Sequence, residues 1–156
     1  MYTFSLCNDK YLIRDTILAP HNIPFQFDDE HDPGEYEPIF DPKLLYIKVE
    51  KNHIYQGLFL LIYKSPIVAE AHLAFLPHAY GHVAEMGKEC LKWIWNNTFI
   101  EHIICPILEY NGLARNCVKK MGFEEFTTEN NAWVRDGTSH NYIWAKIKKY
   151  HNINED

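Results

Sequence analysis

Glu70 and His72 are the residues whose types and spacing most directly suggest chemistry. They stand two positions apart in the stretch 68–76, which is otherwise apolar. Successive side chains of a strand point to opposite faces, so both residues share one face with Ala74. A carboxylate beside an imidazole can act as a general base and its partner, or the two can form a structural hydrogen-bonded pair. The residues alone leave both interpretations open.

A junction that can bind an anion follows directly. The apolar stretch ends at Pro77, a short segment containing Gly81 comes next, and a helical pattern begins near Ala84. Free backbone N–H groups and the helix dipole at such a junction favour a negative group such as a pyrophosphate. Most junctions of this kind bind nothing, so this signal indicates function only together with others.

Composition argues against several other classes of function. The 156 residues carry a formal net charge of -6, which leaves no general basic surface for nucleic acid. The histidines are too dispersed to predict a metal site. The four cysteines are isolated, with no C-x-x-C pair, as expected for reduced thiols of a cytoplasmic protein. We find no signal peptide and no apolar run long enough to cross a membrane.

Apolar periodicity predicts the elements that position these residues. Asn8 is expected to cap a first helix that ends near Pro20, and residues 21–43, rich in proline and acids, to form an irregular excursion. Strands are expected at 44–49, 54–63, 68–76, 100–107, 123–128 and 142–147, and amphipathic helices at 84–97 and 113–121. A basic cluster on the last strand is expected to mark a solvated edge of the sheet. It consists of Lys146, Lys148 and Lys149.

The order of these elements predicts a mixed α/β (α+β) fold. Early strands form antiparallel hairpins, and a crossover helix joins the strands 68–76 and 100–107. We expect these two strands to lie side by side and parallel, and to diverge at their C-terminal ends into a cleft. A single domain is expected over residues 1–156, with the helix and excursion in 1–43, the core in 44–149 and a tail in 150–156.

A second set of residues resembles the GNAT superfamily of N-acetyltransferases. Cys105-Pro106 ends a strand, Asn111-Gly-Leu-Ala114 opens a helix, and Gly122-Phe123 closes it. The family pattern is similar: strand, proline, glycine-rich loop, helix, strand, Asn-x-x-Ala helix, Gly-Phe. The resemblance covers residues 44 to about 149. Within the family, Glu70-x-His72 and the region of Trp93 look most like phage-encoded GNAT-like proteins of the head-assembly type.

The resemblance implies a GNAT-like acyl-CoA N-acyltransferase fold with a splayed parallel strand pair, and acetyl transfer from acetyl-CoA to an amine. Glu70 or His72 would take the proton of the amine, and backbone N–H groups near Phe75 and Leu76 would polarise the thioester carbonyl. Asn111 would help to hold the pantetheine arm, and Ala114, one turn later in the same helix, would belong to the cofactor-binding residues as well. The pyrophosphate would rest on a segment made of Gly81, His82, Val83, Ala84, Glu85, Met86 and Gly87.

The sequence departs from the family pattern at three positions. Val83 and Glu85 stand where the family loop carries glycines, and Glu85 places a negative charge beside the expected pyrophosphate. Val118 stands where many family members carry a tyrosine that protonates the leaving thiolate. These departures favour an alternative function: a non-catalytic, phage-derived protein that uses the same fold in virion head assembly, with phage structural proteins as partners. Its location would then be the host cytoplasm or the virion.

Overall fold

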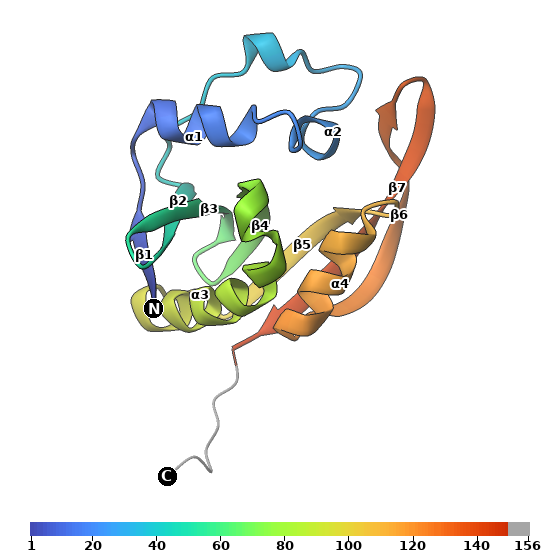
Figure 1. The fold of residues 1–156 in the computed structure, drawn as a ribbon. Helices are drawn as coiled ribbons and strands as arrows, with labels where there is room; N and C mark the ends of the chain where they lie inside the picture. The colour runs from blue at the N-terminus through green and yellow to red at the C-terminus, as the bar shows by residue number, and fades with distance from the viewer. Residues whose placement is uncertain (150–156) are drawn as a thin grey trace.

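A single seven-stranded sheet forms the centre of the molecule. The computed structural model describes residues 1–149, and the tail expected at 150–156 lies outside the described residues. The strand order is β1-β2-β3-β4-β5-β7-β6 (Figure 1). The strands are β1 (Tyr2–Leu6), β2 (Leu44–Lys51), β3 (Ile54–Ser65), β4 (Val68–Phe75), β5 (His102–Leu108), β6 (Glu124–Arg135) and β7 (Thr138–Lys148).

β4 and β5 are parallel neighbours, as the sequence predicts. Their pairing covers only three positions, from Val68 opposite His102 to Glu70 opposite Ile104. Beyond Glu70 both strands continue, β4 to Phe75 and β5 to Leu108, without pairing to each other. The two strands therefore diverge, and the space between their C-terminal halves is called the gap below.

Helices cover both faces of the sheet. α3 (Val83–Asn97) and α4 (Gly112–Met121) lie on one face, and α1 (Lys10–Ile17) and α2 (Ile23–Gln26) lie on the other (Figure 1). The larger core lies under α3 and α4 and includes Phe59, Leu61 and Met86. A smaller core under α1 includes Ile13 and Leu58. Along β4, Ala69 and Ala71 contribute to the first core and Ala74 to the second, so Glu70 and His72 face α1 and α2.

α3 and α4 approach each other closely at Gly87. A Cβ atom at this position would collide with the side chain of Met121 in α4. α4 begins at Asn111, whose Oδ1 accepts from the Ala114 N–H at 3.2 Å. It ends at Gly122, whose φ of 102° lies in the left-handed region that glycine adopts at little cost. The expectation that Asn111 opens and Gly122 closes this helix is confirmed.

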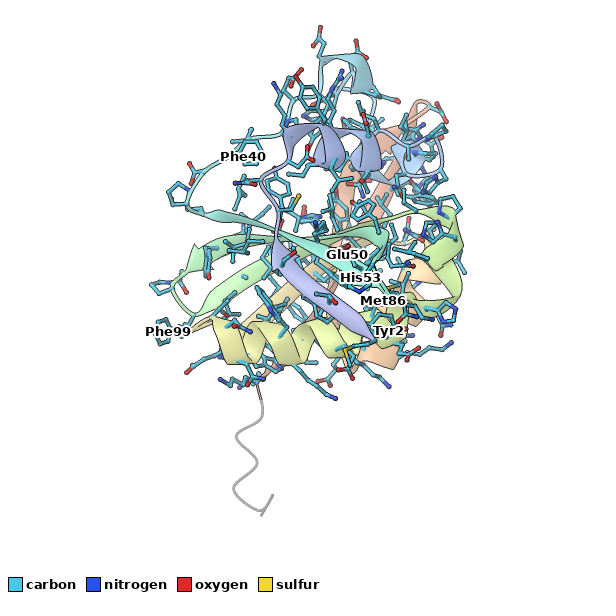
Figure 2. All side chains as sticks on the ribbon, turned by 60° about the vertical axis from the view of Figure 1, so that its left-hand side comes forward. Tyr2, Phe40, Glu50, His53, Met86 and Phe99 are labelled. Carbon is cyan, nitrogen blue, oxygen red and sulfur yellow. The ribbon has the colours of Figure 1, made fainter. Side chains whose placement is uncertain are left out.

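The N-terminal segment differs from its prediction in two ways. β1 precedes the first helix and pairs with β2, although no strand was expected there. Tyr2 on β1 packs beside Met86 of α3 (Figure 2). The cap of α1 is Asp9 and not Asn8, because the Asp9 carboxylate accepts from the N–H groups of Tyr11 and Leu12, both at 3.1 Å.

The excursion is attached to the β6–β7 hairpin at Asp29. Its carboxylate accepts from the N–H groups of Asp136 at 2.8 Å and Gly137 at 2.9 Å, in the hairpin turn. Arg135 Nη1 donates to the Phe27 carbonyl at 2.7 Å. The bonds from Gly137 and then Asp136 lower the pKa of Asp29, because they stabilise its ionised form. We call this contact the Asp29 clasp.

The basic cluster on β7 does not mark an edge of the sheet, so that expectation is wrong. β7 lies between β5 and β6, and the edge strands are β1 and β6. β7 is an inner strand because β6, its partner in the hairpin, lies on the outer side of β7. Lys146 instead places its Nζ 4.9 Å from the ring centre of Phe126 on β6.

Candidate active site

Glu70 and His72 form a direct pair on β4. The distance from His72 Nε2 to Glu70 Oε2 is 2.6 Å, and Lys64 Nζ lies 3.5 Å from Glu70 Oε1. The Glu70 side chain is 14% exposed and that of His72 is 34% exposed, so solvent or a substrate reaches the histidine more readily. The hydrogen bond with His72, partly opposed by burial, lowers the pKa of Glu70. The carboxylate is therefore ionised at neutral pH.

This pairing determines which nitrogen of His72 can act as a base. An ionised carboxylate only accepts hydrogen bonds, so Nε2 must be the donor in the pair. In the neutral ring the basic nitrogen is then Nδ1. The geometry thus allows Glu70 to orient the imidazole while His72 accepts a proton.

The backbone N–H and carbonyl groups of β4 point alternately toward β3 and toward the gap. Leu76 N–H donates to the Gln56 carbonyl of β3 at 2.9 Å. The even-numbered residues of β4 are therefore the ones whose backbone groups form hydrogen bonds with β3. The N–H and carbonyl groups of Leu73 and Phe75 consequently point toward the gap, beyond the pairing with β5. Of the two expected thioester donors, Phe75 N–H is oriented toward the gap, whereas Leu76 N–H is already bonded to β3.

Three side chains of the N-terminal segment reach this same edge. Gln26 Nε2 donates to the Leu73 carbonyl at 2.9 Å. His21 Nε2 lies 2.7 Å from the Phe75 carbonyl, and Asn22 Nδ2 donates to the same oxygen at 3.2 Å. The sequence interpretation missed these residues. No local pattern in this segment, which is rich in proline and acids, indicates that these three side chains contact β4.

The junction after β4 is helical and not an open loop. A 3₁₀ helix, η2 (Pro77–His82), runs directly into α3, which begins at Val83. Gly81 and His82 are exposed in η2. His82 Nδ1 lies 3.9 Å from Glu85 Oε2, so the imidazole can partly offset this negative charge when it is protonated.

The first turns of α3 divide between surface and core. Val83 and Ala84 pack against the larger core, and Met86 and Gly87 are buried in it. Glu85 is the exposed member, with 65% of its side chain accessible. The space beside Gly87 is filled by the side chain of Met121 from α4. The glycine therefore allows the two helices to approach each other closely. Of the expected phosphate segment, Gly81, His82 and Glu85 remain on the surface.

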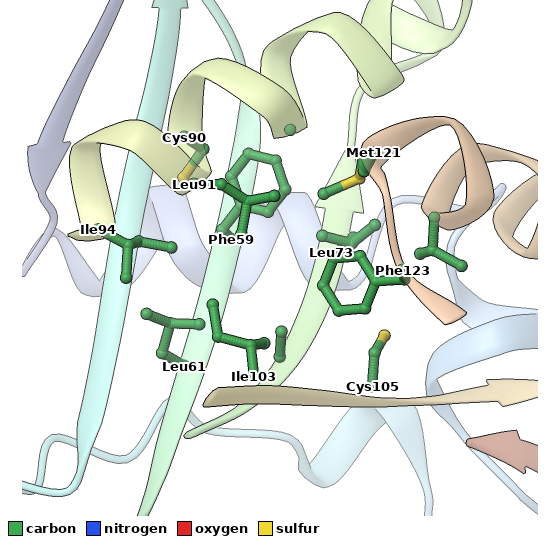
Figure 3. Close-up of a pocket in the computed structure, with 13 residues that line it drawn as sticks. Phe59, Leu61, Leu73, Cys90, Leu91, Ile94, Ile103, Cys105, Met121 and Phe123 are labelled. Carbon is green, nitrogen blue, oxygen red and sulfur yellow. The ribbon is translucent and has the colours of Figure 1, made fainter. Parts of the chain in front are cut away.

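The family-pattern residues in and next to α4 lie on the face of the sheet that α3 and α4 cover. Asn111 uses its side chain to cap α4 at Ala114, as described above. Val118 is 2% exposed and lines a small apolar cavity with Leu73 and Cys105 (Figure 3). At about 20 Å³ this cavity has no room for a ligand larger than a single water. Tyr110, a phenol close to the start of α4 in the sequence, donates its hydroxyl hydrogen to the Pro24 carbonyl at 3.1 Å.

Aromatic side chains continue the sheet face that carries Glu70. Register places Glu70, Ile104 and Lys146 in one row, so Trp144 and Tyr142 share this face. Their rings lie 6.3 Å apart, and Trp144 Nε1 donates to Glu129 Oε1 at 3.1 Å. Burial, with smaller contributions from nearby carboxylates including Glu70, raises the pKa of Tyr142 to about 12.

The described residues show no sign of two other kinds of site. Within residues 1–149, no three His, Cys, Asp or Glu side chains come together in a way that would hold a metal ion. No helix in the same range has the length and apolar character needed to cross a membrane.

The architecture is that of the GNAT acyl-CoA N-acyltransferases. The spermidine N-acetyltransferase of Vibrio cholerae, solved with CoA and spermine, superposes with a TM-score of 0.79 at 17% identity, over 94% of this chain and 95% of that one. A putative phosphinothricin N-acetyltransferase gives 0.68 at 16% identity, covering 95% and 98% of the two chains. The N-acetyltransferase PseH of Campylobacter jejuni gives 0.58 at 13% identity, covering 70% and 71%.

These similarities establish the fold class predicted from the sequence. No family model and no curated protein matches the sequence. Identities of this size show a shared fold and leave the reaction to be argued from the site.

Proposed function

We propose that this protein is an N-acetyltransferase that moves the acetyl group of acetyl-CoA to an amine. The observation that carries the proposal is the gap, because it presents backbone groups of Leu73 and Phe75 beside the Glu70–His72 pair. The pantetheine arm of acetyl-CoA contains two amides and can pair with such a strand edge as a peptide does. The Phe75 N–H would then donate to the thioester oxygen as negative charge develops there.

The proton of the amine would go to His72. The amine nitrogen attacks the thioester carbonyl carbon, a C–N bond forms, and the C–S bond breaks. His72 Nδ1 takes the proton released by the amine, and Glu70 stabilises the imidazolium that results. The leaving group is a thiolate of pKa about 8.5, which can take its proton from solvent. A tyrosine at the position of Val118 is therefore helpful but not required for the balance of the reaction.

The surroundings of the pair suit an amine acceptor. The faces of Trp144 and Tyr142 and the carboxylate of Glu129 can attract a cation. The Vibrio cholerae structure contains spermine, which is such a compound. We propose amines in general as the acceptor class. We place the reaction in the cytoplasm because the four cysteines are free thiols.

Two assays test this proposal. A thermal shift with acetyl-CoA should raise the melting temperature; at 100 times the dissociation constant the gain is about 2.7 kcal/mol, or about 5–11 °C for a chain of this size. Thiol release should then be measured over a panel of primary amines that includes polyamines. Absence of a shift together with absence of thiol release would refute the proposal.

A second candidate is the non-catalytic use of the same fold, including a phage-derived role in virion assembly. One set of observations favours loss of catalysis: Val118 lacks a phenol, and the exposed Glu85 repels phosphate. The structures described above are acetyltransferases, so the phage element rests on the sequence resemblance alone. Association with virion-like assemblies, without a shift by acetyl-CoA, would support this candidate.

A further inference from the structure

Two backbone acceptors that face the gap, the carbonyls of Leu73 and Phe75, already accept hydrogen bonds from the protein itself. Gln26 donates to the Leu73 carbonyl, and both His21 and Asn22 approach the Phe75 carbonyl within hydrogen-bond distance. A carbonyl oxygen has two lone pairs, so Phe75 has no acceptor capacity left. The donors come from a segment that follows α1 and includes α2, on the face where an acceptor amine would approach (Figure 1).

An amide-bearing ligand needs these same acceptors. Each N–H of the pantetheine arm loses water on entering the gap and must find a carbonyl there. If Gln26 and His21 stay in place, the Phe75 carbonyl is closed to those N–H groups and the Leu73 carbonyl offers a single lone pair, which costs affinity. If the two side chains leave, the ligand must compensate for the bonds that are broken.

We infer that His21, Asn22 and Gln26 form an internal competitor that sets the affinity for the acyl donor. This inference rests on the proposed function, since it takes the gap as the site of the pantetheine arm. Donor binding displaces these side chains from Leu73 and Phe75 and loosens residues 21–26. The Asp29 clasp holds the far end of the segment to the β6–β7 hairpin, so the displacement stays local.

Gln26 and His21 are the positions to substitute. Asn22 is buried and also donates to the Thr16 carbonyl at 2.8 Å, so its loss would disturb α1. Gln26→Leu removes the donor while keeping volume, and His21→Ala/Gln26→Ala removes two of the three donors. The matched control is Asn97→Ala. It removes a similar amide-to-carbonyl bond, from Asn97 Nδ2 to Trp93 at 2.8 Å, at the opposite end of α3.

Calorimetry with CoA on the four proteins gives the decisive comparison. Loss of one competing hydrogen bond should tighten CoA binding by about two- to tenfold in Gln26→Leu. The double variant should bind more tightly still, and Asn97→Ala should match the wild type. In the wild type, CoA should also speed amide hydrogen exchange within residues 21–26.

Each other outcome overturns the inference in a recognisable way. Equal or weaker CoA binding by both variants, with binding by the wild type, refutes the competitor while leaving the proposed function intact. Slower exchange of residues 21–26 on CoA addition does the same, because the segment would then be closing on the ligand. Absence of CoA binding in all four proteins refutes the proposed function and this inference together.

Discussion

Replacing Gly87 by alanine tests whether this glycine serves helix packing or ligand approach. Gly87 lies inside α3, where alanine is preferred over glycine by about 1 kcal/mol. The added Cβ would collide with the side chain of Met121, which is buried in α4. Forcing a methyl group into a packed interface costs about 1–3 kcal/mol. We therefore expect Gly87→Ala to destabilise the protein by up to about 2 kcal/mol.

The sign of this effect should reverse when Met121 is shortened. Met121→Ala alone should cost about 2–5 kcal/mol, because it leaves a cavity between the helices. In that background the new methyl group enters the vacated space, and only the helix preference remains. Gly87→Ala should then stabilise by about 1 kcal/mol, which makes the coupling between the two sites about 1–3 kcal/mol.

Urea unfolding of the four proteins, followed by circular dichroism, measures all sides of this cycle. Unchanged m-values would show that the midpoints report stability. If Gly87→Ala stabilises the wild type by the full helix preference, or acts equally in both backgrounds, the packing explanation is wrong. A loss of CoA affinity without any change in stability would indicate that Gly87 serves the approach of the ligand.

Three further predictions concern the site and its surroundings. His72→Asn should lower the rate of thiol release by about 10²- to 10⁴-fold with little change in CoA affinity; a rate close to that of the wild type would exclude His72 as the base. Glu85→Gln should tighten CoA binding about two- to fivefold at low salt, an advantage that vanishes at high salt; salt-independent affinity would place the phosphates elsewhere. Asp29 has a lowered pKa, so its clasp stabilises fully above the ordinary value of 3.8 and is lost as pH falls through the lowered value. The melting-temperature difference between wild type and Asp29→Asn should accordingly shrink on acidification; a difference that grows would contradict the clasp.

The sequence predicted the centre of the fold well because its signals there are local and strong. The nearly uniform apolar run became β3, and the stretch after it became β4, ending at Phe75, one residue before the predicted end. The helix expected from residue 84 begins at Val83. The crossover helix sufficed to predict the parallel pair, and the family resemblance implied its divergence.

The periphery was predicted less well, for physical reasons that can be named. β1 is short and lies at an edge, but its alternation of Tyr2, Phe4 and Leu6 with small polar residues was a usable signal. The β6–β7 hairpin is longer than expected at both strands. Its Asp136-Gly137 turn is a strong hairpin pattern that the interpretation did not use.

Features of the candidate site that depend on long-range contacts could not be predicted. The alternation placed Glu70 and His72 on one face, but not the distance between them or the role of Lys64. The contacts of Gln26 with β4 join residues 47 positions apart, and no local pattern specifies them.

The position of β6 at the edge of the sheet bears on how the protein avoids pairing with other chains. A long edge strand that exposes Phe126 offers unpaired backbone groups to a neighbour, except at Val134, whose carbonyl accepts from the Asp29 N–H at 2.8 Å. Its register is interrupted between Glu125 and Thr127 and again between Glu129 and Trp133. Such irregularities bend and twist a strand, so a second flat strand cannot align along its whole length. Substitutions that remove these two interruptions would therefore turn the β6 edge into a template for aggregation.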